Sequence, residues 1–107
     1  MKLRTLIIAA AGLTLAAGAA SAETPWQAHH PRRVEVNHRL DHINRQVRHE
    51  RLQGDLTAAQ ARRLHERAHM IRMQEQRFAR HDAGHLTRHE QARLNHEENG
   101  LHRHVPG

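Results

Sequence analysis

The stretch Gly54–Gln60 (GDLTAAQ) decides the fold of this chain, because it recurs thirty residues later as Gly84–Glu90 (GHLTRHE). Each copy carries residues that end one helix and begin the next. The glycine suits the left-handed conformation that follows a helix C-terminus. The threonine is a favourable N-cap, the Gln or Glu three residues on completes a capping box, and the leucine before the cap supplies an apolar staple. The residues assigned to these two joints are Gly54, Leu56, Thr57, Gln60, Gly84, Leu86, Thr87 and Glu90.

Apolar residues spaced three and four apart on both sides of the joints predict three helices. The first runs from Val34 onward, the second over residues 58–81 and the third over residues 88–104. Their apolar stripes are Val36, Leu40, Ile43 and Val47, then Ala61, Leu64, Ala68, Ile71 and Phe78, and finally Leu94, Leu101 and Val105. Glu98 and Gly100 interrupt the third stripe, so we expect it to be the weakest. The fold class is therefore all-α, with three helices joined by two tight Gly-x-Leu-Thr turns.

The composition limits the core that these helices can build. Only 37% of the 107 residues are hydrophobic and only 2% are aromatic. We expect a small core within a helical domain over residues 34–107, with self-association as a homodimer as one way to complete it. Residues 23–33 precede this domain, and Pro25 and Pro31 favour a flexible leader there.

The N-terminus has the pattern of a secretory signal. A short basic start precedes the apolar run Thr5–Ala20, and Ala20, Ser21 and Ala22 supply the small residues of a cleavage site. The alternative is an uncleaved anchor, but the apolar run is shorter than the roughly 20 residues that a spanning helix needs. We therefore predict a signal peptide over residues 1–22. The mature product would be periplasmic or secreted, with no transmembrane anchor.

The joints also resemble a known sequence pattern. Residues 56–60 (LTAAQ) fit the LTxxQ pattern of the periplasmic helical stress family of CpxP and Spy, which has the metal-responsive relatives ZraP and CnrX. Residues 86–90 (LTRHE) are a near copy with Glu in place of Gln. Over most of residues 34–104 the chain is similar to small exported proteobacterial helical proteins with two G-x-L-T-x-x-E/Q joints. The stress-family resemblance, which covers only the joints, implies a helical dimer that binds unfolded client proteins or metal.

Histidine is the most conspicuous residue type, with 13 copies that all follow residue 22. It is the commonest protein metal ligand and changes its charge between pH 5 and 8. Two pairs have the i,i+4 spacing that places imidazoles one helical turn apart on one side. A further set of three repeats every fourth residue across the second joint. The candidate ligands for Zn, Ni or Cu are His38, His42, His65, His69, His81, His85 and His89.

Helical geometry places these rings on the outside of the predicted bundle. His38, His42 and His49 fall opposite the first apolar stripe, whereas His65 and His69 flank the second stripe. Two histidines supply only half of the four ligands of a structural zinc site. The same residues are equally consistent with neutral filling of a solvated surface. Protonation in acid would add charge to a chain that already carries +6, which predicts expansion by self-repulsion.

Three functions remain open from the sequence. The first is a non-catalytic periplasmic binding or stress protein that holds Zn, Ni or Cu weakly at several surface sites. The second is an ATP-independent chaperone like Spy or CpxP, with unfolded envelope proteins as partners. The third is a small structural protein without a ligand.

Several other functions are disfavoured. The chain has no cysteine, and its single serine, Ser21, belongs to the predicted signal, so we expect no enzyme. Arginines alternate with acidic residues, as in Arg45–Arg51, which argues against a nucleic-acid partner. The joints match the second half of an EF-hand loop, but Ala79, His81 and Ala83 stand where calcium requires oxygen ligands.

Overall fold

The computed structural model describes residues 22–107, and within them the chain forms four helices and no strands. The helices are α2 (Pro25–His29), α3 (Pro31–Leu52), α4 (Ala58–His81) and α5 (Arg88–His102). The all-α prediction is therefore confirmed. In this part of the chain no helix is both long and apolar enough to span a membrane. The predicted signal peptide lies outside the described residues, apart from Ala22.

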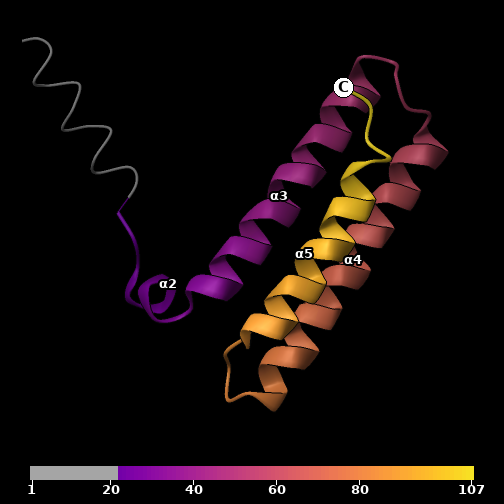
Figure 1. Ribbon diagram of the computed structural model, residues 1–107. Helices are drawn as coiled ribbons and strands as arrows, with labels where there is room; N and C mark the ends of the chain where they lie inside the picture. The colour runs from indigo at the N-terminus through magenta and orange to yellow at the C-terminus, as the bar shows by residue number, and fades with distance from the viewer. Residues whose placement is uncertain (1–21) are drawn as a thin grey trace, which may run out of the picture.

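The three long helices form a bundle in which each packs against the other two. Figure 1 shows α3 and α5 running in the same direction, with α4 antiparallel to both. The two joints consequently lie at opposite ends of the bundle. Helix α2 packs only against α3 among the helices of residues 22–107. The C-terminal segment after α5 ends beside the α3–α4 joint, as Figure 1 shows.

Two helices begin within residues 23–33, where Pro25 and Pro31 had suggested a flexible leader. Pro25 begins α2 and Pro31 begins α3, so α3 starts three residues before Val34. Proline is well tolerated at the first helical position, because the amide it lacks would have no intrahelical partner there. Thr24 caps α2 in a capping box with Gln27. The spacing T-x-x-Q in residues 24–27, which also occurs at the first joint, is the sequence signal for this helix that we missed.

Both joints contain the local interactions that their sequences suggest. The Gln60 amide donates to Thr57 Oγ1 at 3.1 Å, and the Thr57 amide donates to Gln60 Oε1 at 2.8 Å. Thr87 and Glu90 repeat the arrangement at 3.1 and 2.9 Å. The joint glycines have φ values of +86° and +90°, in the region that only glycine enters without strain. Helix α4 has the predicted bounds, and α5 ends two residues before the predicted end.

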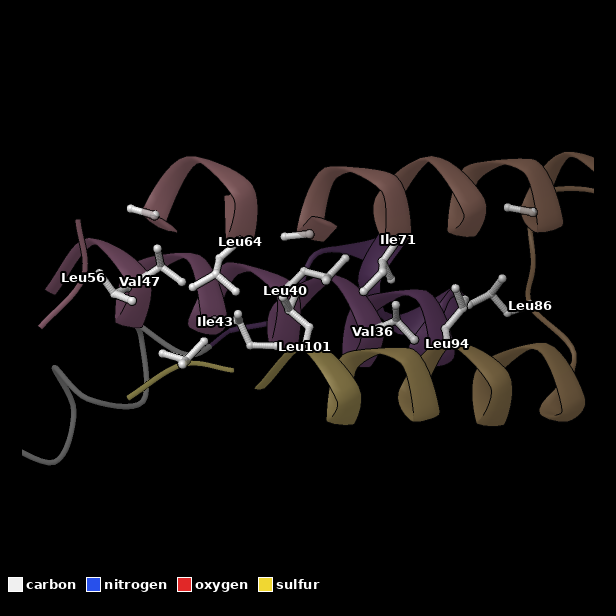
Figure 2. Packing of buried hydrophobic residues seen from close by; sticks show 14 residues of the cluster. Val36, Leu40, Ile43, Val47, Leu56, Leu64, Ile71, Leu86, Leu94 and Leu101 are labelled. Atoms are coloured by element: carbon white, nitrogen blue, oxygen red, sulfur yellow. The ribbon is translucent and has the colours of Figure 1, made fainter. Parts of the chain in front are cut away.

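The core is a single layer of aliphatic side chains between the three helices. Figure 2 shows side chains of α4 and α5 pointing toward each other and toward α3. The predicted stripe residues are buried, except that Phe78 is only partly buried and packs against the cluster. The structure adds three hydrophobic residues to the core: Leu56, Ala79 and Leu86. The two leucines come from the joints, so each joint also closes one end of the core.

Two glutamates occupy core positions that the sequence analysis did not assign. Glu75 on α4 and Glu98 on α5 are both 0% exposed. Glu98 lies between Leu94 and Leu101 in the spacing of an apolar stripe, as Glu75 follows Ile71. The same spacing that identified the apolar stripes therefore contains the signal for both buried carboxyls. We had interpreted Glu98 only as an interruption.

Candidate functional site

The histidines lie on the outside of the bundle. Of the seven predicted ligands, six are exposed, and the half-buried one is His65. The rings predicted to lie opposite the first apolar stripe are exposed on α3 as expected. The imidazoles therefore remain accessible to an ion from solution.

An open groove of about 770 Å³ brings one predicted pair together. It follows the first half of α4 and reaches the end of α3. Both His65 and His69 line it, one helical turn apart. The complete lining is Arg51, Ala58, Ala61, Arg62, His65, Glu66, His69 and Met70. The pair thus lines one shared depression at the surface.

A hydrogen bond from α3 orients one ring of this pair. His65 Nδ1 lies 2.8 Å from Asn44 Oδ1. An amide oxygen only accepts, so the proton of this bond belongs to Nδ1. The neutral ring then has its lone pair on Nε2, the atom left for a metal. Such outer partners fix the tautomer and orientation of metal-binding histidines.

The other predicted ligands are less favourably arranged. His38 and His42 form an exposed pair on α3. The set of three around the second joint is divided between the end of α4, the joint itself and α5. Across residues 22–107 no group of three or more His, Cys, Asp or Glu side chains is arranged to hold a metal ion. The structure therefore offers pairs, and only the pair in the groove has an outer hydrogen-bond partner on a neighbouring helix.

His85, a predicted ligand, is instead part of an aromatic stack. Its ring stacks on His30 with centroids 4.6 Å apart, and His30 stacks on Trp26 at 4.2 Å. The Arg33 guanidinium lies 5.3 Å from the centre of the Trp26 ring. Arg32 Nη1 donates to Leu86 O at 3.2 Å, which ties the start of α3 to the same joint. The stack fastens α2 to the α4–α5 joint, and Trp26 lies within the segment for which we expected a flexible leader.

Each joint also brings two carboxyl groups together. A side-chain hydrogen bond with Asp55 raises the pKa of Glu50 at the first joint, and burial adds to the effect. At the second joint the pKa of Asp82 is raised mainly by its hydrogen bond with Glu90. In both cases a neighbouring histidine, His49 or His81, acts in the opposite direction. At each joint one carboxyl group, that of Glu50 or Asp82, therefore retains its proton more readily than usual. The pKa of Glu90 is lowered, because the effect of burial is outweighed by hydrogen bonds with Thr87 and Asp82.

The buried carboxyl of Glu75 has a cation beside it. Arg33 Nε donates to Glu75 Oε2 at 2.5 Å and Arg33 Nη2 donates to Oε1 at 3.3 Å. A third bond joins Arg33 Nη1 to Gly84 O at 3.3 Å. A two-point pairing of this kind satisfies both carboxylate oxygens. Arg33 and Glu75 thus form a structural ion pair that links α3 to α4 next to the second joint.

Glu98 has no equivalent partner. Among residues 22–107, neither of its carboxyl oxygens has a hydrogen-bond donor. The nearest cation is Arg39, whose Nη1 lies 3.6 Å from Oε1 and whose Nη2 donates to Asn99 instead. Burial is the main reason that the pKa of Glu98 is raised to about 8. At neutral pH the uncharged acid is therefore the predominant form of this side chain.

Comparison of the chain with protein-family models, curated proteins and solved structures finds no match. The resemblance of the two joints to the LTxxQ family therefore stays a prediction. The assignment of function rests on the side chains described above.

Proposed function

We propose that the protein is a non-catalytic binder of Zn, Ni or Cu ions, with the His65–His69 pair as its principal site. The observation that carries this proposal is the hydrogen bond between His65 Nδ1 and Asn44, beside a groove that His69 also lines. Asn44 leaves Nε2 of His65 available as a ligand. Imidazole nitrogen is a suitable donor for all three metals.

The expected affinity is modest, because one pair supplies two of the four ligands that zinc prefers. Water would complete the coordination shell. The exposed pair His38 and His42 would bind more weakly, since no outer partner orients it. This arrangement suits buffering or sensing of a metal that is present in excess. Periplasmic location, which the sequence predicts, would place the protein where such ions first enter the cell envelope.

Isothermal titration of the metal-free protein with ZnCl2, NiCl2 or CuCl2 at pH 7.5 tests the proposal. Replacing His65 and His69 by Gln should weaken the tightest binding event at least tenfold. Asn44→Ala should weaken it by about tenfold, because it leaves both rings in place but removes the orienting bond. The matched control is His96→Gln, which removes a single exposed ring on α5 and should change little. Binding no tighter than millimolar in the unaltered protein would refute the proposal.

A second candidate is a binder of unfolded proteins, and the composition of the groove favours it. The wall includes Ala58, Ala61 and Met70, and Met70 is 65% exposed. Exposed methionine adapts its shape to varied apolar partners. We expect the protein to suppress aggregation of an unfolded substrate and Met70→Gln to reduce that effect. Aggregation that proceeds unchanged at equimolar protein would count against this function without affecting the metal site.

A further inference from the structure

The strongest unexplained feature of the core is Glu98. Its side chain is fully buried between Leu94 and Leu101 on α5, in the stripe that packs against α3 and α4. Among residues 22–107 no donor reaches either of its oxygens. An ionised carboxylate without donors is far costlier to bury than an uncharged one. The packing of α5 therefore requires a carboxyl group that carries its proton.

The charged groups around Glu98 do not change this requirement. On α3 they are Arg39 and Glu35, and on α4 the facing cation is Arg72. Arg39 is hydrogen-bonded to Asn99 on α5, and Glu35 accepts a bond from Gln91 Nε2 at 3.0 Å.

Arg72 is likewise occupied away from Glu98. Its Nη2 donates to Asp41 at 2.7 Å and its Nη1 donates to Asn37 at 3.1 Å. Arg72 is thus held by other acceptors. Arg39 keeps its Nη1 3.6 Å from Glu98 Oε1, too far for a hydrogen bond, and Glu35 adds a like charge. Burial outweighs the attraction of Arg39 and Arg72, so the proton remains the direct means of neutralising Glu98.

We propose that docking of α5 onto α3 and α4 is coupled to the uptake of one proton by Glu98. Acid then keeps the three-helix core closed, and rising pH frees α5 and exposes the apolar seam of α3 and α4. The step is a simple protonation, in which the Glu98 carboxylate takes a proton from solvent to give the carboxylic acid.

Helix α5 is the element suited to this movement. It has 15 residues, against 22 in α3 and 24 in α4. Helices α3 and α4 would still pack against each other when α5 leaves. The surface uncovered would include Leu40, Ile43 and Ile71, which belong to the shared core.

The sign of the pH dependence follows from the two states. When α5 is released, Glu98 titrates near its ordinary pKa of 4.5, and when α5 is docked the pKa is about 8. Between these values the docked state holds one proton more than the released state. The equilibrium constant for docking is therefore highest below pH 4.5, falls about tenfold per pH unit up to pH 8, and stays constant at higher pH. This direction is opposite to the expansion in acid expected from histidine protonation.

Hydrogen–deuterium exchange of the full chain between pH 5.5 and 7.5 tests the coupling, with each rate divided by the intrinsic exchange rate at that pH. In the unaltered protein, protection of the α5 amides should fall about tenfold per pH unit. Protection in α4 should fall less. Glu98→Gln keeps the shape but cannot ionise, so its α5 protection should not depend on pH. Glu97→Gln, on the neighbouring residue, is the matched control and should behave like the unaltered protein.

Two results would overturn the proposal. One is a protection of the α5 amides that changes equally with pH in the unaltered protein and in Glu98→Gln. The other is loss of protection in α4 in step with α5, which would mean that the whole bundle unfolds. If Glu98→Gln does not fold, Glu98→Leu is the second variant, and it too should show α5 protection that is independent of pH.

Discussion

Glu75 and Glu98 have the same chemical group, the same complete burial and the same kind of position in an apolar stripe, but their surroundings differ. Arg33 meets both oxygens of Glu75 and continues to the backbone of the second joint. Glu98 has the Arg39 guanidinium at 3.6 Å with no hydrogen bond to it, and Arg72 is engaged by Asp41 and Asn37. Burial alone therefore does not define the role of a carboxyl group. A hydrogen-bonded cation makes Glu75 a permanent link between two helices, whereas the lack of any hydrogen bond to its carboxyl makes Glu98 sensitive to the proton.

The largest effect should come from removing the cation that is paired with Glu75. Arg33→Met keeps the aliphatic stem but leaves Glu75 buried without its cation. We expect a loss of about 3–5 kcal/mol in the free energy of unfolding, measured by urea denaturation at pH 7.5. Adding Glu75→Met to the same chain should recover much of the loss. Arg45→Met, at an exposed position of α3, is the control. A single Arg33 variant as stable as the control would show that the pair is unimportant.

Replacing Glu98 should change the free energy of unfolding in the opposite direction. Glu98→Leu should raise the free energy of unfolding at pH 7.5 by about 1–4 kcal/mol, because an uncharged apolar side chain has no proton to acquire on folding. The pKa of Glu98 is raised from 4.5 to about 8, so the stability that its protonated form permits is lost progressively between these pH values. The gain from leucine should accordingly be smaller at pH 4.5 than at pH 7.5. Urea denaturation at the two pH values measures it, and a pH-independent effect would contradict this assignment.

A smaller effect should distinguish α4 from α5, the helices that carry these glutamates. Thr57→Ala and Thr87→Ala remove equivalent N-caps, and each should cost about 1 kcal/mol. The first should act on α4 and the second on α5, where it adds to the weakness that Glu98 introduces. Hydrogen exchange resolved by helix distinguishes the two. If both variants reduce protection equally throughout the bundle, α5 is not an independently released element.

Much of the fold follows from local sequence. The two joints, the bounds of α4 and the stripe over Val36–Val47 are all as expected, because capping and helical periodicity depend on residues within one or two turns. Helices begin within residues 23–33, where we expected a flexible leader, and the reason is instructive. We interpreted Pro25 and Pro31 as helix breakers, although proline at the first helical position is compatible with a helix, and Thr24 with Gln27 repeats a cap recognised elsewhere.

The candidate site was foreseen less completely. Spacing predicted that His65 and His69 share one side of a helix. The bond from Asn44 joins residues that are 21 positions apart and required the packing of α3 on α4. The stack of His85 on His30 likewise depends on where α2 lies.

The sequence by itself determined the three long helices, the two joints and the outward position of most histidines, because each of these is set by neighbours along the chain. Only the tertiary structure decided which buried glutamate has a hydrogen-bonded cation, which histidine is oriented and where α2 attaches. These features depend on distances between helices, and the free energy of a buried charge is governed by the groups that such packing brings within a few ångströms.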